Sequence, residues 1–137
     1  MPTAVWVAER SYAMRVMAEC HQKLKNDHAA EMWLHKAAAE HPMAREGWVA
    51  LSELMYSQSR WEECLAYASR ALRIHHRMND YTCEPSAYGW KPHDLAAIAA
   101  WRMGLKDVAI EQGKLALQFA PNDKRLLDNL SWYQGDK

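Results

Sequence analysis

Glutamates, cysteines and histidines are the side chains of this sequence that could support acid–base, nucleophilic or metal chemistry. Glu62 and Glu63 are adjacent, so on a helix they point about 100° apart and cannot flank one bond as paired catalytic carboxylates do. The three cysteines, Cys20, Cys64 and Cys83, are an odd number without C-x-x-C spacing. This pattern is typical of free thiols rather than of a disulfide framework or a structural zinc site.

Seven histidines invite a metal hypothesis, and three of them recur at intervals of seven residues. His21, His28 and His35 would fall on two helices and the turn between them, so their rings are not expected to converge at the ~2.0–2.1 Å that zinc requires. The sequence also contains no Ser-His-Asp arrangement, Gly-rich phosphate loop or zinc-binding helix motif. We therefore predict that the chain is not an enzyme and that it binds no metal and no cofactor.

Charge and hydropathy exclude several classes of partner and location. The formal net charge is zero and the pI is near 7.1, so no positive field draws the chain to nucleic acid or to anionic lipid. The longest run without charged or polar residues, 95–101, is far shorter than the ~20 apolar residues of a membrane span. The first ten residues lack the pattern of a secretory signal. We expect a cytoplasmic protein with no nucleic-acid partner and no membrane span.

Pairs of small residues seven positions apart recur along the chain, which indicates a repeat architecture. The pairs are Ala30 with Ala37, Cys64 with Ala71, and Ala109 with Ala116. The first step is 34 residues and the second is 45, which is the same period plus an insertion of eleven. Small side chains at these points allow two antiparallel helices to approach closely. Together with an alanine-rich composition poor in β-branched residues, the spacing predicts an all-α fold.

These units resemble the tetratricopeptide repeat (TPR), whose period is 34 residues and whose signature includes a Trp, two alanines and a closing Pro. The segments that carry the resemblance are 48–52 (WVALS), 61–64 (WEEC) and 104–121 (GLKDVAIEQGKLALQFAP). The resemblance implies a right-handed α-solenoid of about three helix pairs plus a C-terminal capping helix. We expect a single domain over 1–137, with repeats at about 11–44, 45–78 and 90–123, an insertion at about 76–91 and a capping helix at about 123–134.

The expected helices cover 4–24, 27–41, 44–57, 60–75, 92–103, 106–119 and 123–134. Within them, pairs of large residues three apart should face the core. Met14 with Met17, and Leu127 with Leu130, are two of these pairs.

A second resemblance is more specific. The segments 81–105 (YTCEPSAYGWKPHDLAAIAAWRMGL), 121–133 (PNDKRLLDNLSWY) and 6–14 (WVAERSYAM) look like the C-terminal repeat region of bacterial family-2 glycosyltransferases. In that family a catalytic nucleotide-sugar domain precedes the repeats. This chain has no Asp-x-Asp motif for a metal and a diphosphate. The resemblance therefore implies a bacterial accessory domain that is associated with a glycosyltransferase and does not itself transfer sugar.

In such a superhelix the first helix of each unit lines a concave groove, and Tyr, Trp and Arg are frequent binding anchors there. The residues that we expect in a partner-binding groove are Tyr12, Arg15, Glu19, Glu53, Tyr56, Ile98, Trp101, Arg102, Arg125 and Trp132. The three arginines among them are expected to be available for carboxylates of the partner. Chaperone-adaptor repeats that grip a C-terminal carboxylate use Lys, Asn and Arg at set positions. Glu19, Ala50 and Leu95 occupy three of those positions here, which disfavours that specialised function.

The insertion contains too many aromatic residues for a linker that makes no contacts, and its Pro and Gly residues block a regular helix. Tyr81, Tyr88 and Trp90 either fold back to plug the groove or form a platform for a partner. We therefore predict a non-catalytic protein- or peptide-binding or assembly module. The alternative is a domain that binds a small molecule or a saccharide acceptor with the insertion and the groove.

The N-terminal end offers a second surface for association. Val5, Trp6 and Val7 have no preceding repeat on which to pack, so this end could support a homo-oligomer.

Overall fold

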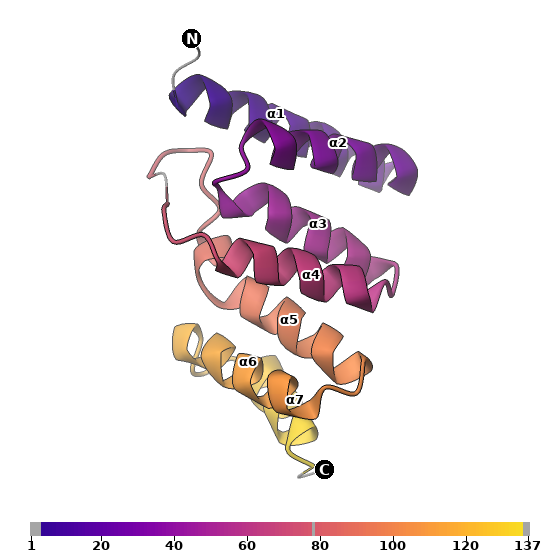
Figure 1. Ribbon diagram of the computed structural model, residues 1–137, viewed down its shortest axis with the longest axis vertical. Helices are drawn as coiled ribbons and strands as arrows, with labels where there is room; N and C mark the ends of the chain where they lie inside the picture. Colours follow the sequence, from indigo (N-terminus) through magenta and orange to yellow (C-terminus); the bar gives the residue numbers. More distant parts are fainter. Residues whose placement is uncertain (1–3, 78, 136–137) are drawn as a thin grey trace.

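The computed structural model describes residues 4–77 and 79–135 (Figure 1). Within these ranges the regular secondary structure is entirely helical. The helices are α1 (Ala4–Lys23), α2 (Asp27–Glu40), α3 (Arg45–Ser57), α4 (Trp61–Leu72), the short 3₁₀ helix η1 (Pro85–Tyr88), α5 (Trp90–Arg102), α6 (Lys106–Phe119) and α7 (Lys124–Tyr133). The predicted all-α class is confirmed, and the ends of the seven expected helices all lie within three residues of the observed ones.

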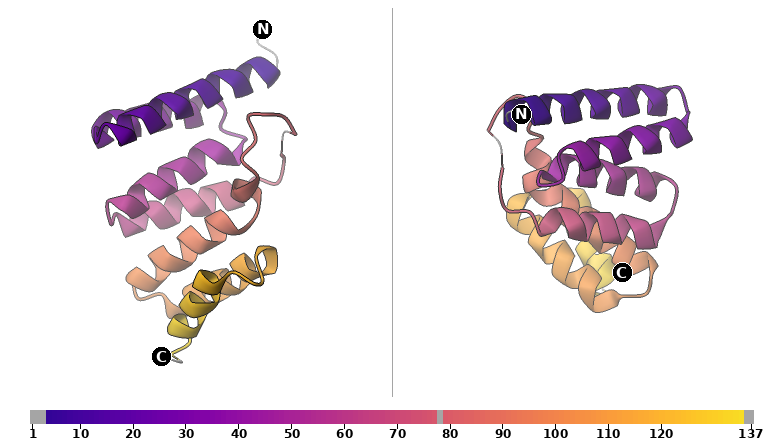
Figure 2. Two further views of the ribbon diagram at one scale, coloured as in Figure 1. Left: turned by 180° about the vertical axis from the view of Figure 1, so that it is seen from behind. Right: turned by 45° about the horizontal axis from the view of Figure 1, so that its top comes forward.

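The helices stack in chain order as antiparallel pairs (Figures 1 and 2). Each α-helix packs against the one before it and the one after it, while α3 also contacts α1 and α5 directly. Each unit therefore buries its apolar face mainly against its neighbours in sequence, which is the construction of a solenoid. The first helix of each pair lies beside the first helix of the next pair.

Small residues lie where the paired helices approach each other, as the repeat spacing predicts. The six small residues of the repeated pairs have at most 1% of their surface exposed: Ala30, Ala37, Cys64, Ala71, Ala109 and Ala116. Gly47 allows a second kind of close approach, between α2 and α3. A Cβ atom at Gly47 would lie 3.1 Å from the backbone nitrogen and Cα of Ala38, so even a methyl group would crowd this contact.

The ends of the helices follow from local side-chain chemistry. Asn26 caps α2 and Asp123 caps α7, since each side chain accepts a hydrogen bond from a backbone N–H three residues on. Gly104 adopts a φ of 79° in the turn between α5 and α6, a conformation that costs glycine little. Lys25 and Ser59 take the left-handed conformation in the equivalent turns of the other two hairpins, although neither residue signals it.

The core is continuous from α1 to α5 and is centred on Leu51, Leu54 and Met55, which are fully buried. A smaller cluster at the C-terminal end packs Tyr133 of α7 against α5 and α6. Met17 and Leu127 are exposed, so the prediction that they face the core is wrong. These two residues lie on the first and last helices, which have a neighbouring helix on one side only.

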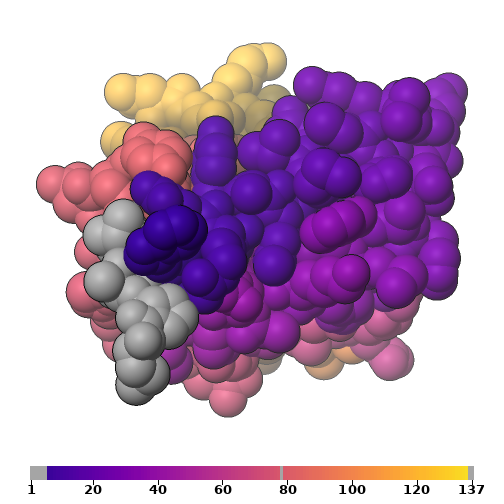
Figure 3. All heavy atoms as spheres, turned by 90° about the horizontal axis from the view of Figure 1, so that it is seen from above, coloured from indigo at the N-terminus to yellow at the C-terminus, as the bar shows by residue number. Residues whose placement is uncertain are grey.

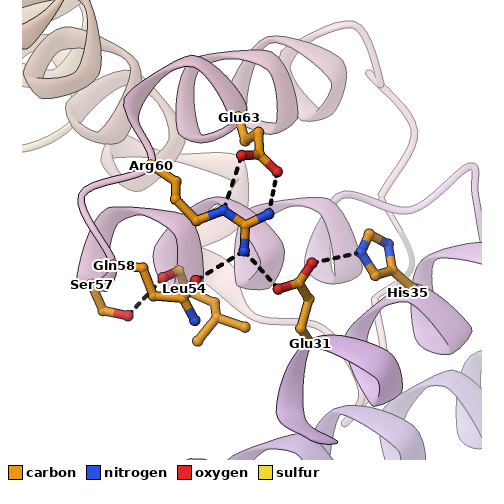
Figure 4. A network of polar contacts seen from close by, with 7 residues as sticks. All are labelled: Glu31, His35, Leu54, Ser57, Gln58, Arg60 and Glu63. Carbon is orange, nitrogen blue, oxygen red and sulfur yellow. Dashed lines mark hydrogen bonds and ion pairs between the residues drawn. The ribbon is translucent and has the colours of Figure 1, made fainter. Parts of the chain in front are cut away.

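Arg60 connects the first two hairpins through a branched polar network (Figure 4). Its guanidinium donates to the carboxylates of Glu31 in α2 and Glu63 in α4, and to the side-chain carbonyl of Gln58. This contact holds the pKa of Glu31 below its usual value. Glu63 is therefore bound to Arg60, and the network fixes α2 against the α3–α4 turn.

The insertion between the second and third helix pairs runs from the end of α4, at Leu72, to the start of α5, at Trp90. It runs past α3 toward α1 and then turns back through η1, which leads into α5 (Figures 1 and 2). The insertion was expected to extend to about 91, but α5 begins two residues earlier than predicted. Pro92 is tolerated there because the first turn of a helix has no partner for its missing N–H.

Candidate functional site

A groove lies along the first helices of the hairpins and consists of two adjoining hollows. The first, here called the upper hollow, has a volume of about 330 Å³ and is lined by α1, α2, α3, the insertion and the start of α5. The second, the lower hollow, has a volume of about 260 Å³ and is lined by α3, α5 and α7. Glu53 and Lys91 line both hollows. Their side chains form an ion pair of 3.4 Å, which marks the boundary between the hollows.

Six of the ten residues predicted for a partner-binding groove line these hollows. Arg15 and Glu19 line the upper hollow, Glu53 lines both, and Tyr56, Ile98 and Arg125 line the lower one. The repeat register brings these residues from α1, α3, α5 and α7 to one side of the molecule. What they bind remains a prediction.

The other four predicted groove residues lie outside both hollows. Trp101 packs against Tyr133 with their ring centroids 5.5 Å apart, so it contributes to the small C-terminal core. The guanidinium of Arg102 lies 5.4 Å from the ring centroid of Trp61. Tyr12 contacts Tyr81 edge to face. Trp132 is 53% exposed and lies seven residues after Arg125, hence on the same face of α7.

The three arginines predicted to be available for carboxylates of a partner each make contacts within the molecule, and their availability to a partner stays a prediction. Arg125 forms a bidentate pair with Asp94, with nitrogen–oxygen distances of 2.7 and 3.3 Å. Arg15 donates from Nη2 to the carbonyl oxygen of Thr82 at 2.6 Å. Arg102 is exposed, and its guanidinium lies over the ring of Trp61. The sequence places these residues on the correct helices, but only the packing reveals their partners.

Asp94 is the buried charge of the lower hollow. Its burial raises the pKa of its carboxyl group, while the hydrogen bonds from Arg125 oppose that rise. The pKa of Arg125 is raised in turn, chiefly by its hydrogen bond to Asp94. A buried charge of this kind depends on its partner, because removing one member leaves the other uncompensated. The pair therefore fixes α7 to α5 at the edge of the groove.

Tyr88 of the insertion is a structural residue. Its hydroxyl donates to Oε1 of Glu46 at 2.9 Å and accepts from the backbone N–H of Arg45 at 3.2 Å. Its ring packs against the main core and under the guanidinium of Arg45. Burial raises the pKa of the Tyr88 hydroxyl, so it remains a donor. Tyr88 therefore folds back onto the helices, which is the structural one of the two roles considered for the insertion.

The other two aromatic residues of the insertion are more accessible. Tyr81 is 66% exposed and meets Tyr12 with ring centroids 5.6 Å apart. Trp90 is half-buried in the wall of the lower hollow, where the guanidinium of Arg125 lies 5.9 Å from its ring centroid. One aromatic residue of the insertion is therefore packed into the molecule, while the other two remain partly open, and their role as a platform for a partner stays a prediction.

Several residues of the groove were missed by sequence reasoning. Glu46 and Glu84 line the upper hollow, and Lys91 lines both hollows. Glu46 is nearly buried in the first turn of α3, where it accepts hydrogen bonds from Tyr88 and from the backbone N–H of Glu84. No local pattern marks this contact, because it joins positions 38 and 42 residues apart.

The cysteines and histidines are scattered. Cys64 is buried, Cys20 is exposed and Cys83 is intermediate, and all three are free thiols. His28 is exposed at the start of α2, while His35 contacts Glu31 at 3.3 Å. Among residues 4–77 and 79–135, no three His, Cys, Asp or Glu side chains are grouped to hold a metal ion. Nor, in the same ranges, does any helix combine the length and apolarity needed to cross a membrane.

Comparison with known proteins shows which solved structures share this fold. No family model matches the chain, and no curated protein matches it. Among solved structures, 29 chains match. One is the N-terminal domain of stress-induced protein-1 (STI-1) from C. elegans, with a TM-score of 0.77 at 14% identity, over 97% of this chain and 99% of that chain. At this identity the likeness concerns the fold alone.

The chain is thus an all-α solenoid with the fold of a TPR-type helical-repeat domain. Fold alone does not define an activity. The groove formed by its first helices is the feature from which a function can be argued.

Proposed function

We propose that this chain is a non-catalytic protein- or peptide-binding module that holds its partner in the concave groove. The observation that carries the proposal is the pair of adjoining hollows, which runs across α1, α3, α5 and α7. A groove of this form can accommodate successive side chains of one extended segment. Tyr56 is the proposed anchor, because the residue is 43% exposed at the lower hollow and its ring contacts that of Trp61 edge to face.

Selection of short random peptides on the immobilised full chain tests this proposal. The selected peptides should bind the Tyr56→Ala variant about thirtyfold more weakly than the original chain, as expected for an anchor at the centre of an interface. Ile98→Ala should also weaken them, while Leu127→Ala, on the exposed side of α7, should not. Trp132→Ala shows whether the site continues along α7. Binding that depends on Tyr81 and not on Tyr56 would instead place the partner on the insertion.

A second candidate is a saccharide or another small molecule in the lower hollow. Tyr56 and Trp90 provide aromatic surface there, and the ion-paired Glu53 and Lys91 provide polar groups at its edge. Titration calorimetry with candidate sugars separates the candidates. Saturable heat that is abolished by Trp90→Ala would favour the saccharide, whereas the peptide proposal predicts no such heat.

A cytoplasmic role beside a bacterial glycosyltransferase is a further part of the proposal. It is supported by the resemblance of 81–105 and 121–133 to the repeat region of that family. The coding sequence just upstream tests it, because a nucleotide-sugar domain is expected there. Purified chain alone should show no transfer from a labelled nucleotide sugar.

Self-association through the N-terminal end also remains a proposal. Trp6 is exposed and Val7 is intermediate on α1, while the side chain of Val5 lies outside the described residues. The surface of this end is seen in Figure 3. If two copies associate here, Trp6→Asp should lower the mass measured by light scattering. An unchanged mass would exclude this end as the interface.

A further inference from the structure

The upper hollow brings together carboxylates from three separate elements. Glu19 comes from α1, Glu46 and Glu53 come from α3, and Glu84 comes from the insertion. The cationic groups that line the same hollow are Arg15 and Lys91. Its apolar lining comes mainly from the partly or fully buried residues Leu34, Val49, Ala50 and Ala87.

The cationic groups at this hollow already have acceptors within the protein. Arg15 donates to the carbonyl oxygen of Thr82, and its guanidinium lies 5.3 Å from the ring centroid of Tyr12. Lys91 is paired with Glu53. Arg45, next to Glu46 in α3, donates to the carbonyl oxygens of Ile74 and Ala87. Each of these three cations thus has an acceptor within the protein, while Nε of Arg15 is buried without one in the described part of the chain.

The carboxylates are the more accessible charges. Among residues 4–77 and 79–135, the side chain of Glu84 makes no hydrogen bond and no ion pair. Glu19 pairs with Lys23 one helical turn away at 3.4 Å, and an exposed pair of this kind is weak. The exposed fraction of the side chain is 64% for Glu19 but only 27% for Lys91. The charged side chains that a ligand meets in the upper hollow are therefore mainly carboxylates.

We propose that the upper hollow receives a lysine or arginine side chain of the bound peptide, while the lower hollow receives an apolar or aromatic one. The inference rests on the proposed function of the groove and specifies the class of partner. Ammonium and guanidinium groups only donate hydrogen bonds, and their bonds to carboxylates are charge-assisted. In the lower hollow both cations are paired, Lys91 with Glu53 and Arg125 with Asp94, so apolar surface dominates its walls.

Peptides selected from the random library test the charge preference. Those that bind in the groove should contain a basic residue and a large apolar residue more often than the library does. For the strongest peptide, replacing the basic residue by Gln should weaken binding about tenfold in fluorescence anisotropy. Replacement by Glu should weaken it further. Added salt should reduce the difference, because it screens exposed charges.

A double substitution assigns the preference to the upper hollow. Glu19→Gln with Glu84→Gln should remove most of the difference between the basic peptide and its Gln analogue. The matched control is Glu62→Gln with Glu111→Gln, which neutralises two exposed carboxylates outside both hollows and should preserve the difference. Thermal melts of both double variants should resemble that of the original chain, since the four carboxylates are exposed.

The outcomes separate this inference from the proposed function. Peptides that depend on Tyr56 but show no excess of basic residues would overturn the inference and leave the groove as a peptide site. A preference that survives the Glu19 and Glu84 double substitution would also overturn it. If no selected peptide depends on groove residues, both the inference and the proposed function are rejected.

Discussion

At the scale of single residues, the chain illustrates how burial changes what a side chain can do. Glu46 is 8% exposed, and its carboxylate is satisfied by the Tyr88 hydroxyl and by the backbone N–H of Glu84. An acidic residue in the first turn of a helix would ordinarily be read as a solvated group that favours the helix dipole. Here the same residue secures the insertion to α3.

The Tyr88–Glu46 hydrogen bond should contribute measurably to stability. Tyr88→Phe removes the hydroxyl and leaves a nearly buried carboxylate without one donor, which should cost about 1–3 kcal/mol. Urea unfolding followed by circular dichroism measures this loss. Tyr81→Phe is the matched control in the same insertion and should leave the free energy of unfolding nearly unchanged, because Tyr81 is exposed. Equal effects of the two substitutions would contradict the structural role of Tyr88.

The three thiols should differ sharply in reactivity. Burial raises the pKa of Cys64, although its contact with Ser52 opposes the rise, and the thiolate is the reactive form. In the folded protein an aromatic disulfide reagent should modify Cys20 rapidly and Cys64 only after denaturant is added. The Cys20→Ser variant should therefore have one rapidly modified thiol fewer than the original chain. Rapid modification of Cys64 in the folded state would show that the contact between α3 and α4 opens readily.

At the scale of elements, the distance between paired helices is set by the small residues of the repeat. Ala71 and Ala116 are essentially buried, and Gly47 and Gly113 leave no free space for a side chain. Large residues at these positions would force the helices apart.

Ala71→Trp should destabilise the domain by about 1–3 kcal/mol or more, because its ring would overpack a contact between helices. Ala66→Trp on the same helix is the control, since Ala66 is exposed and should tolerate the ring. Thermal melts of the two variants give the comparison. A melting temperature of Ala71→Trp within a degree or two of the original would place Ala71 away from the partner helix.

At the scale of the whole molecule, stability should depend on pH through two partly buried histidines. Burial is the main cause that lowers the pKa of His41 and of His93 below the ordinary value of 6.5. The unfolded chain then binds protons more readily than the folded one. The stability due to these groups is therefore complete above about pH 6.5 and is lost as the pH falls through their lower folded values.

Melting temperatures measured at about pH 7.5 and about pH 5.5 should show this loss. A variant with His41→Asn and His93→Asn should show a smaller difference between the two conditions. Glu31 and Asp80 also have lowered pKa values, but their contribution is lost only at lower pH, near the ordinary values of carboxyl groups. Equal melting temperatures of the original chain at the two pH values would contradict the prediction.

The sequence by itself determined the helices and their pairing. Hydrophobic periodicity, the small-residue spacing, the caps at Asn26 and Asp123 and the turn at Gly104 are all local signals, and local signals decide where a helix begins and ends. Because each unit of a solenoid packs on its neighbours in sequence, the same signals also determined which helices lie side by side. Six of the ten residues that this register assigns to the groove line the two hollows.

Only the tertiary structure decided which of those residues are accessible and what charge the groove presents. Arg125 pairs with Asp94 across 31 positions, and Arg15 reaches Thr82 across 67. These contacts depend on where the irregular insertion lies, and no periodic pattern encodes its path. For the same reason Trp101 could not be assigned to the C-terminal core, nor Glu46 to the insertion, before the helices were placed in space. Contacts between side chains that are far apart in sequence form only where the packing of the helices and the insertion brings those side chains together.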